Sequence, residues 1–188
     1  MVSVLRHTVF RRLFLAQVVA LAGTGLATVA LSLLAYRLAP SAAAVVLGTA
    51  LAVKMLAYVF VAPVATAAVA RFPRRAVLVG ADLMRAAAAM VLPFVTEVWQ
   101  VYALVFLLQA ASATFTPTFQ SVIPDILPGE EEFTAALSLS RLAYDLESVL
   151  SPMLAAALLL LVPASALFFG TGAGFVASAA LVAGTAIP

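Results

Sequence analysis

The sequence predicts an all-α membrane protein of six transmembrane helices, which together form a single domain over residues 1–188. Three observations lead to this fold class. Six apolar stretches fill most of the chain, its residues are 65% hydrophobic and only 10% charged, and its arginines concentrate in alternate gaps between the stretches. A typical soluble domain has about 25% charged residues. The predicted spans are residues 13–36, 42–70, 76–95, 101–122, 134–162 and 165–187.

The first three stretches are long enough to cross a bilayer as helices. A hydrocarbon core about 30 Å thick needs about 20 helical residues, and in lipid the backbone polar groups must pair within the segment. The first stretch is longer than the apolar region of a signal peptide, about 7–15 residues, so we expect it to be retained. Pro40-Ser41 separates it from the second stretch, and Phe72-Pro73 separates the second from the third.

The last three stretches are bounded in the same way. Pro124, Pro128 and Gly129 bracket an acidic loop between the fourth and the fifth stretch. Residues 130–132 in this loop are all glutamate, and they favour a helix start because carboxylates stabilise the positive end of the helix dipole. Residues 163–165 then separate the fifth stretch from the sixth.

Positive charge predicts the orientation in the membrane. The arginines on one side are Arg6, Arg11, Arg12, Arg71, Arg74 and Arg75. On the other side only Arg37 lies in a connecting loop. Since loops rich in Lys and Arg stay in the cytoplasm, we expect a multi-pass protein of the cell membrane with both termini cytoplasmic.

Composition argues against several other functions. A net charge of +2, dispersed along the chain, does not suggest nucleic-acid binding. The chain has no cysteine and one histidine, His7, so we expect neither a metal nor another cofactor. We find no nucleophile elbow, no His-Glu-x-x-His pair and no ATP-binding loop, and therefore expect no enzyme activity and no nucleotide-driven transport.

The loop after the second stretch carries a recognisable motif. Residues 63–75 resemble the loop between helices two and three of the major facilitator superfamily, Gly-x-Leu-Ala-Asp-Arg-x-Gly-Arg-Arg. The three arginines that match this gate-loop motif are Arg71, Arg74 and Arg75. The places of the first glycine, the aspartate and the second glycine are taken by Thr66, Ala70 and Pro73.

More of the chain is similar to the drug- and siderophore-exporter branch of that superfamily. The similar segments in the first three helices are Gln17 with residues 23–25 and 36–38, and residues 81–86. Those in the fourth and fifth helices are residues 115–117 with Gln120, residues 123–128 with Glu131, residues 135–138, and Ser151-Pro152, where the family usually has Gly-Pro. This resemblance implies one half of a major-facilitator bundle, with a possible division into two inverted three-helix repeats. It implies secondary active transport, in the form of efflux of small amphipathic compounds by proton antiport.

The resemblance covers only the first six helices of a twelve-helix family, in which substrate passes between two six-helix halves. We therefore expect a homodimer, or a complex with a second half-transporter, as the active form in the bilayer. The alternative is a non-transporting half-bundle that binds or assembles with another membrane protein. Ala70 favours this alternative because it cannot make the charged contact of the family's loop aspartate.

Ionisable residues within the spans are the candidates for substrate binding and proton coupling. They are Lys54, Asp82, Arg85, Arg141, Asp145 and Glu147. A charge in the middle of a bilayer costs at least about 2.5–3.5 kcal/mol, so we expect each to face the bundle interior, a cavity or a partner. The spacing places Asp82 with Arg85, and Arg141 with Asp145, on shared helix faces. Asp145 and Glu147, two residues apart, point to nearly opposite sides.

Two interpretations of these charges remain open. In the first, the pairs Asp82–Arg85 and Arg141–Asp145 form a structural network that holds the bundle together. In the second, Glu147 or Asp145 is the protonation site, and Lys54 or Arg141 contacts an anionic ligand. Carboxyl groups in the membrane commonly serve as proton relays in transporters.

Small residues and prolines predict local packing. Gly170 and Gly174 form a small-xxx-small pair that predicts close helix packing. Gly23 and Gly25 either flex the first helix beside a cavity or pack against a neighbour. The prolines expected to kink their helices are Pro63, Pro93, Pro117 and Pro152.

Overall fold

The computed structural model describes residues 2–69 and 71–187, and among these residues it contains helices and connections but no strand. The main helices are α1 (Thr8–Leu38), α2 (Ala43–Val69), α3 (Arg74–Val91), α4 (Val98–Ile126), α5 (Glu130–Leu159) and α6 (Ala164–Ala183). Two short 3₁₀ helices, η1 (Val2–Arg6) and η2 (Leu92–Phe94), precede α1 and follow α3. All six main helices are long and apolar enough to cross a membrane. The predicted all-α membrane fold is confirmed.

The helix ends differ from the predicted spans in ways that follow from local chemistry. α4 continues through Pro124 to Ile126, whereas we expected this proline to lie in the loop. A proline removes one backbone donor but does not prevent the next turn, and Leu127 N–H still donates to the Ile123 carbonyl. Pro93 does not kink α3, because the α-helix already ends at Val91 and continues as the 3₁₀ turn η2.

The fifth and sixth helices end before the apolar runs that predict them. α5 ends at Leu159 and α6 at Ala183, so the last few apolar residues of each run lie in turns. Hydropathy alone does not show whether an apolar residue at the end of a run belongs to the helix or to the following turn. The start of α5 at Glu130 agrees with the predicted effect of the three glutamates on the helix dipole.

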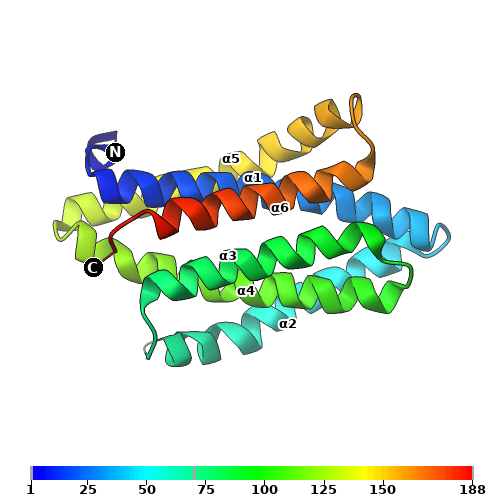
Figure 1. Cartoon of the computed structure of the whole chain (residues 1–188), viewed down its shortest axis with the longest axis horizontal. Coiled ribbons are helices and arrows are strands. Elements are labelled where there is room, and N and C mark those ends of the chain that lie inside the picture. The colour runs from blue at the N-terminus through cyan, green and yellow to red at the C-terminus, as the bar shows by residue number, and fades with distance from the viewer. Residues whose placement is uncertain (1, 70, 188) are drawn as a thin grey trace.

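The centre of the bundle is formed by α1, α3, α4 and α6, and its sides by α2 and α5. α6 packs between α1 and α3, α3 packs on α4, α2 packs mainly on α4, and α5 packs mainly on α1. Figure 1 shows both termini and the α2–α3 and α4–α5 connections at one end, and the other three connections at the opposite end. Only 17% of the apolar window of α2 and 11% of that of α5 is buried, against 39–44% for the other helices. α2 and α5 therefore present the most uncovered surface.

Glycines bring α1 and α6 close together. A Cβ added at Gly174 would lie 3.3 Å from the Val19 carbonyl oxygen, and one added at Gly23 would lie 3.1 Å from that of Thr171. The Thr171 hydroxyl donates to the Gly23 carbonyl oxygen across this seam at 2.9 Å. The predicted close packing is confirmed at Gly174, whereas Gly170 makes only an ordinary contact with a leucine side chain.

We expect Gly174→Leu to destabilise the bundle by about 1–3 kcal/mol, the usual cost of forcing extra volume into a packed contact. Unfolding of the purified protein in detergent micelles, followed by the loss of helical circular dichroism, measures this. Gly80→Leu is the matched control, because no atom lies within 4 Å of a Cβ added at Gly80. Equal losses of stability in the two variants would contradict the tight seam.

Candidate membrane-embedded site

The six candidate residues fall into three environments. Asp82 and Arg85 are buried, with 0% and 5% of their surface exposed. Lys54 on α2 and Glu147 on α5 are half-buried. The side chains of Arg141 and Asp145 are 81% and 63% exposed. Only the first pair lies in the interior of the bundle.

Asp82 and Arg85 form the centre of a cluster that ties three helices together. The Arg85 guanidinium donates to one Asp82 carboxylate oxygen, as their spacing predicts. The Ser178 hydroxyl on α6 donates to the other oxygen at 2.7 Å. The guanidinium carbon also lies 4.4 Å from the ring centre of Phe115 on α4 and 4.5 Å from that of Phe175 on α6. A cation between two aromatic faces and beside a carboxylate is stabilised without water.

A polar path leads from Arg85 toward the uncovered helices. Its members are Tyr58 on α2, Thr116 on α4 and Tyr144 on α5, and both tyrosine hydroxyls lie in the electrostatic field of the guanidinium. The Thr116 and Tyr144 hydroxyl oxygens are 3.5 Å apart, and the Tyr58 hydroxyl lies near Thr116. The Nε of Arg85 has no hydrogen-bond partner within the described part of the chain.

These three hydroxyl residues are not among the candidates predicted from the sequence. The signal that marks them is their position near the middle of apolar spans, away from the membrane surfaces where tyrosine normally concentrates. Tyrosine and threonine have only moderate hydropathy values. A search for charged residues within apolar spans therefore does not find them.

Lys54 on α2 and Glu147 on α5 are the two half-buried candidates, and their opposite charges attract each other. The Glu147 carboxylate lies near the side chain of Ser151, one turn further along α5. On α1, Gly25 lies directly against this group. A Cβ added at Gly25 would overlap the Ser151 side chain and lie 2.7 Å from a Glu147 oxygen. Of the two expectations for Gly25, packing against a neighbouring helix is therefore confirmed.

The Arg141–Asp145 pair differs from the expected structural network. The Nε of Arg141 and an oxygen of Asp145 are 3.5 Å apart, but both side chains lie on the exposed side of α5 and hold no helices together. The reason is that α5 packs on α1 through a different face, where the Ser140 hydroxyl donates to the buried Gln17 amide oxygen at 3.1 Å. The expectation that this pair stabilises the bundle is wrong.

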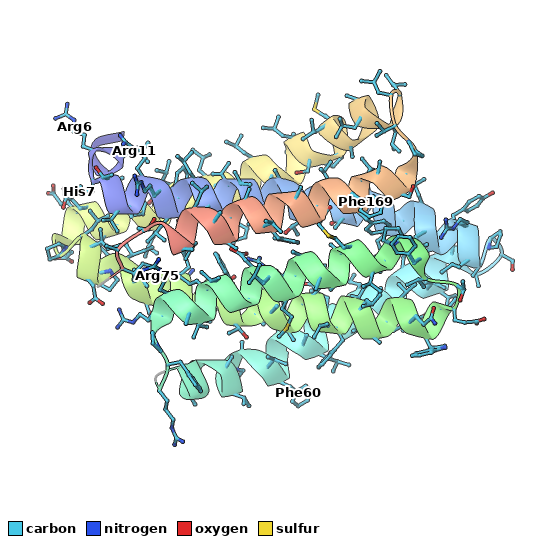
Figure 2. The ribbon with its side chains drawn as sticks, in the orientation of Figure 1. Arg6, His7, Arg11, Phe60, Arg75 and Phe169 are labelled. Atoms are coloured by element: carbon cyan, nitrogen blue, oxygen red, sulfur yellow. The ribbon has the colours of Figure 1, made fainter. Side chains whose placement is uncertain are left out.

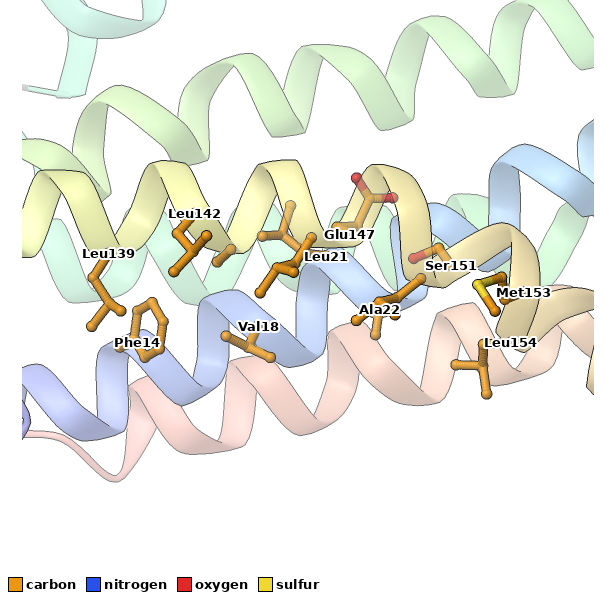
Figure 3. A pocket seen from close by; sticks show the side chains of 13 residues that line it. Phe14, Val18, Leu21, Ala22, Leu139, Leu142, Glu147, Ser151, Met153 and Leu154 are labelled. Carbon is orange, nitrogen blue, oxygen red and sulfur yellow. The ribbon is translucent and has the colours of Figure 1, made fainter. Parts of the chain in front are cut away.

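An apolar groove of about 750 Å³ lies between α1 and α5 (Figure 3), and we name it the α1–α5 groove. Val18 and Ala22 line it from α1, and Leu142, Leu146 and Leu150 line it from α5. Glu147 and Ser151 are the only polar residues in its lining. Figure 3 shows the Glu147 carboxylate pointing away from the groove, so the stem of this side chain borders it.

Comparison with known proteins decides the family. A model of the Major Facilitator Superfamily matches residues 13–187. The chain belongs to this superfamily. The match includes residues of all six helices, so the resemblance carried by the arginine loop extends over residues 13–187.

The superfamily relatives include proteins named for efflux. Macrolide efflux protein A of Streptococcus pyogenes is 30% identical over 133 residues, which are 68% of this chain and 33% of that protein. Macrolide efflux protein A of Enterococcus faecalis is 32% identical over 108 residues, 55% of this chain and 33% of that protein. The chain therefore spans about a third of the length of the curated relatives it matches. No solved structure matches the chain significantly.

The superfamily's arginine loop fastens α3 to α4 at the end that holds the termini. Arg74 donates to the Asp125 carboxylate and, at 3.3 Å, to the Ser121 carbonyl oxygen. Arg71 and Arg75 are exposed, and Figure 2 shows Arg75 at the same end of the molecule as Arg6 and Arg11. Ala70, which stands in place of the family's aspartate, lies outside the described residues.

Proposed function

We propose that this superfamily member is a secondary active transporter of the plasma membrane that exports small amphipathic compounds in exchange for protons. The observation that carries the proposal is the position of two ionisable side chains, Lys54 and Glu147, near the middle of α2 and α5, the two least covered helices. Charges at this depth are costly unless they serve a pathway. The names of the macrolide efflux relatives support the direction of transport and the amphipathic class of substrate.

The pair supplies a simple coupling chemistry. While Glu147 is ionised, Lys54 balances its charge across the space between α2 and α5. Uptake of a proton by Glu147 removes this attraction. Tyr58, Thr116 and Tyr144 lie beside the pair's helices and offer hydroxyls to a substrate or to water.

A second six-helix bundle completes the pathway in this proposal. With α2 and α5 uncovered, Arg141 and Asp145 are exposed at membrane depth, where each charge costs about 2.5 kcal/mol or more in lipid. A second bundle, related to the first by an axis along the membrane normal as in other transporters of this class, encloses these charges in a shared polar cavity. A second copy of the chain or a further half-transporter fulfils this role.

Transport is tested by expressing the chain in cells that lack related exporters and measuring the export of a fluorescent amphipathic dye. We expect export that stops when a protonophore collapses the proton gradient. A chain that captures another membrane protein in cross-linking but exports no dye in any assembly would instead support the non-transporting alternative.

We expect both termini to lie in the cytoplasm. Single cysteines introduced at Ser41 and Glu97 should react with an impermeant thiol reagent added outside intact cells, because both positions lie at the end of the bundle opposite the termini. Cysteines at Arg75 and Glu131 should react only after the cells are opened. Since the chain has no native cysteine, each signal comes from one position. The reverse labelling pattern would overturn the orientation.

A further inference from the structure

The segment before α1 is packed into the bundle. Val4 is fully buried, in the same core cluster as Leu127 at the end of α4 and Ala136 on α5. η1 accordingly contacts both α1 and α5. Residues 2–7, which we name the N-terminal strap, therefore join the first helix of the bundle to the start of the fifth.

A second contact of the N-terminal strap involves the only histidine in the chain. The Nε2 atom of His7 lies 3.2 Å from a carboxylate oxygen of Glu132, in the first turn of α5. The two side chains are 44% and 39% exposed, so protons from the surrounding water reach them. Figure 2 shows His7 with Arg6 and Arg11 at the end of the molecule that holds the termini.

His7 is the group in this region whose charge responds to pH near neutrality. The charged residues on the elements packed around the strap are Arg6 on η1, Arg11 and Arg12 on α1, Asp125 on α4, and Glu130, Glu131 and Glu132 on α5. Asp125 already pairs with Arg74, and Arg12 donates to the Gly184 carbonyl oxygen at 3.0 Å. Between about pH 5 and 8 an imidazole gains or loses its proton, whereas solvated arginine and carboxylate side chains ordinarily keep their charge.

Docking of the strap changes the carboxylates near His7 but not the arginines. Arg6 and Arg11 are close to His7 along the chain, so they and the positive end of α1 act on the imidazole whether or not the strap is docked. The Glu132 carboxylate reaches it only in the docked arrangement. A proton on His7 therefore favours docking, because Nε2 then donates to Glu132 as part of a positively charged ring.

The helix that the strap contacts is the least buried of the six. Only 11% of the apolar window of α5 is buried. A further hydrogen bond from α5 to α1, between Ser140 and Gln17, lies about two turns beyond Glu132. The first two turns of α5 therefore depend strongly on the contacts of Val4 and His7.

We propose that the N-terminal strap fastens the first turns of α5 to α1, and that protonation of His7 tightens it. The strap is a pH-sensitive device that limits the movement of α5 when the medium at this end of the bundle becomes acidic. This property of the fold is independent of transport. One consequence rests on the proposed function: protons released at this end by an exporter slow the movement of α5, and with it further export.

The test is hydrogen exchange of the backbone amides of residues 133–137 in the full chain in lipid nanodiscs, followed by mass spectrometry at pH 6 and pH 8. Protection factors are compared, because they remove the intrinsic effect of pH on exchange. We expect about two- to fivefold higher protection at pH 6, the effect of a surface ion pair. Residues 168–172 of α6 are the reference segment and should be protected equally at both pH values.

Four variants separate the contacts of the strap. His7→Gln and Glu132→Gln keep polar side chains but remove the charge pair, so the effect of pH on protection should vanish in both. Arg11→Gln is the matched control, because it removes another charge one turn further along α1, and it should keep the effect of pH. Val4→Ala removes a buried apolar contact and should lower the protection of residues 133–137 about tenfold at both pH values.

Several results would overturn the proposal. Equal protection of the parent chain at both pH values would do so, as would an effect of pH that persists in His7→Gln. Unchanged protection in Val4→Ala would show that η1 does not hold α5. The expected pattern without any export of dye would contradict the transport function and support the strap as a property of the fold.

Discussion

Exchange of Glu147 for glutamine is expected to lower proton-driven export at least about tenfold and to leave the remaining export insensitive to pH. Glutamine has nearly the same shape as glutamate but neither takes up a proton nor balances Lys54, so the attraction between α2 and α5 no longer depends on protonation. Export from vesicles containing the purified protein, measured at a series of imposed pH gradients, gives both quantities.

Asp145→Asn separates the two candidate carboxylates of α5. Asp145 lies on the exposed side of the helix beside Arg141, without the Gly25 contact that holds Glu147. We therefore expect a smaller loss of export in Asp145→Asn and an unchanged pH profile. An unchanged pH profile in Glu147→Gln, together with a lost one in Asp145→Asn, would transfer the coupling role to Asp145.

Removal of the Asp82 carboxylate is expected to cause the largest loss of stability in the chain. Asp82→Ala leaves the Arg85 cation buried between Phe115 and Phe175 without its balancing charge, which costs about 3–5 kcal/mol for a buried pair. Unfolding in mixed micelles, with helical circular dichroism as the signal, measures the loss.

The double variant with Asp82→Leu and Arg85→Met is the informative control. Both charges are then absent, and the side chains that replace them fill a similar volume, so we expect most of the stability to return. A double variant as unstable as Asp82→Ala would show that the hydrogen bond from Ser178, rather than charge balance, dominates the cluster.

The positions of the spans were predictable because bilayer crossing depends on length and hydropathy, both of which the sequence displays directly. The pairing of Asp82 with Arg85 was predictable for a similar reason, since residues three apart share a helix face. The same rule also paired Arg141 with Asp145, correctly as neighbours. It could not tell that this face of α5 points outward.

The rotation of each helix about its axis limited the sequence analysis. An amphipathic helix shows its buried face as a stripe of apolar residues, but α2 and α6 are apolar around most of their circumference and show no such stripe. The distance of Lys54 from Glu147, and of Tyr144 from Thr116, depends on that rotation and on the packing of helices distant in sequence. Spacing along one helix contains no information about either distance.

The contact between Gly25 and Ser151 has a consequence for the evolution of the family. The two helices leave room for one small side chain where they cross, and in this chain α5 provides it. A relative with glycine at the position of Ser151, as the family's usual Gly-Pro motif has, leaves that room free for a side chain from α1. Substitutions at the two positions are therefore expected to covary among homologues, with a larger residue on one helix accompanied by glycine on the other.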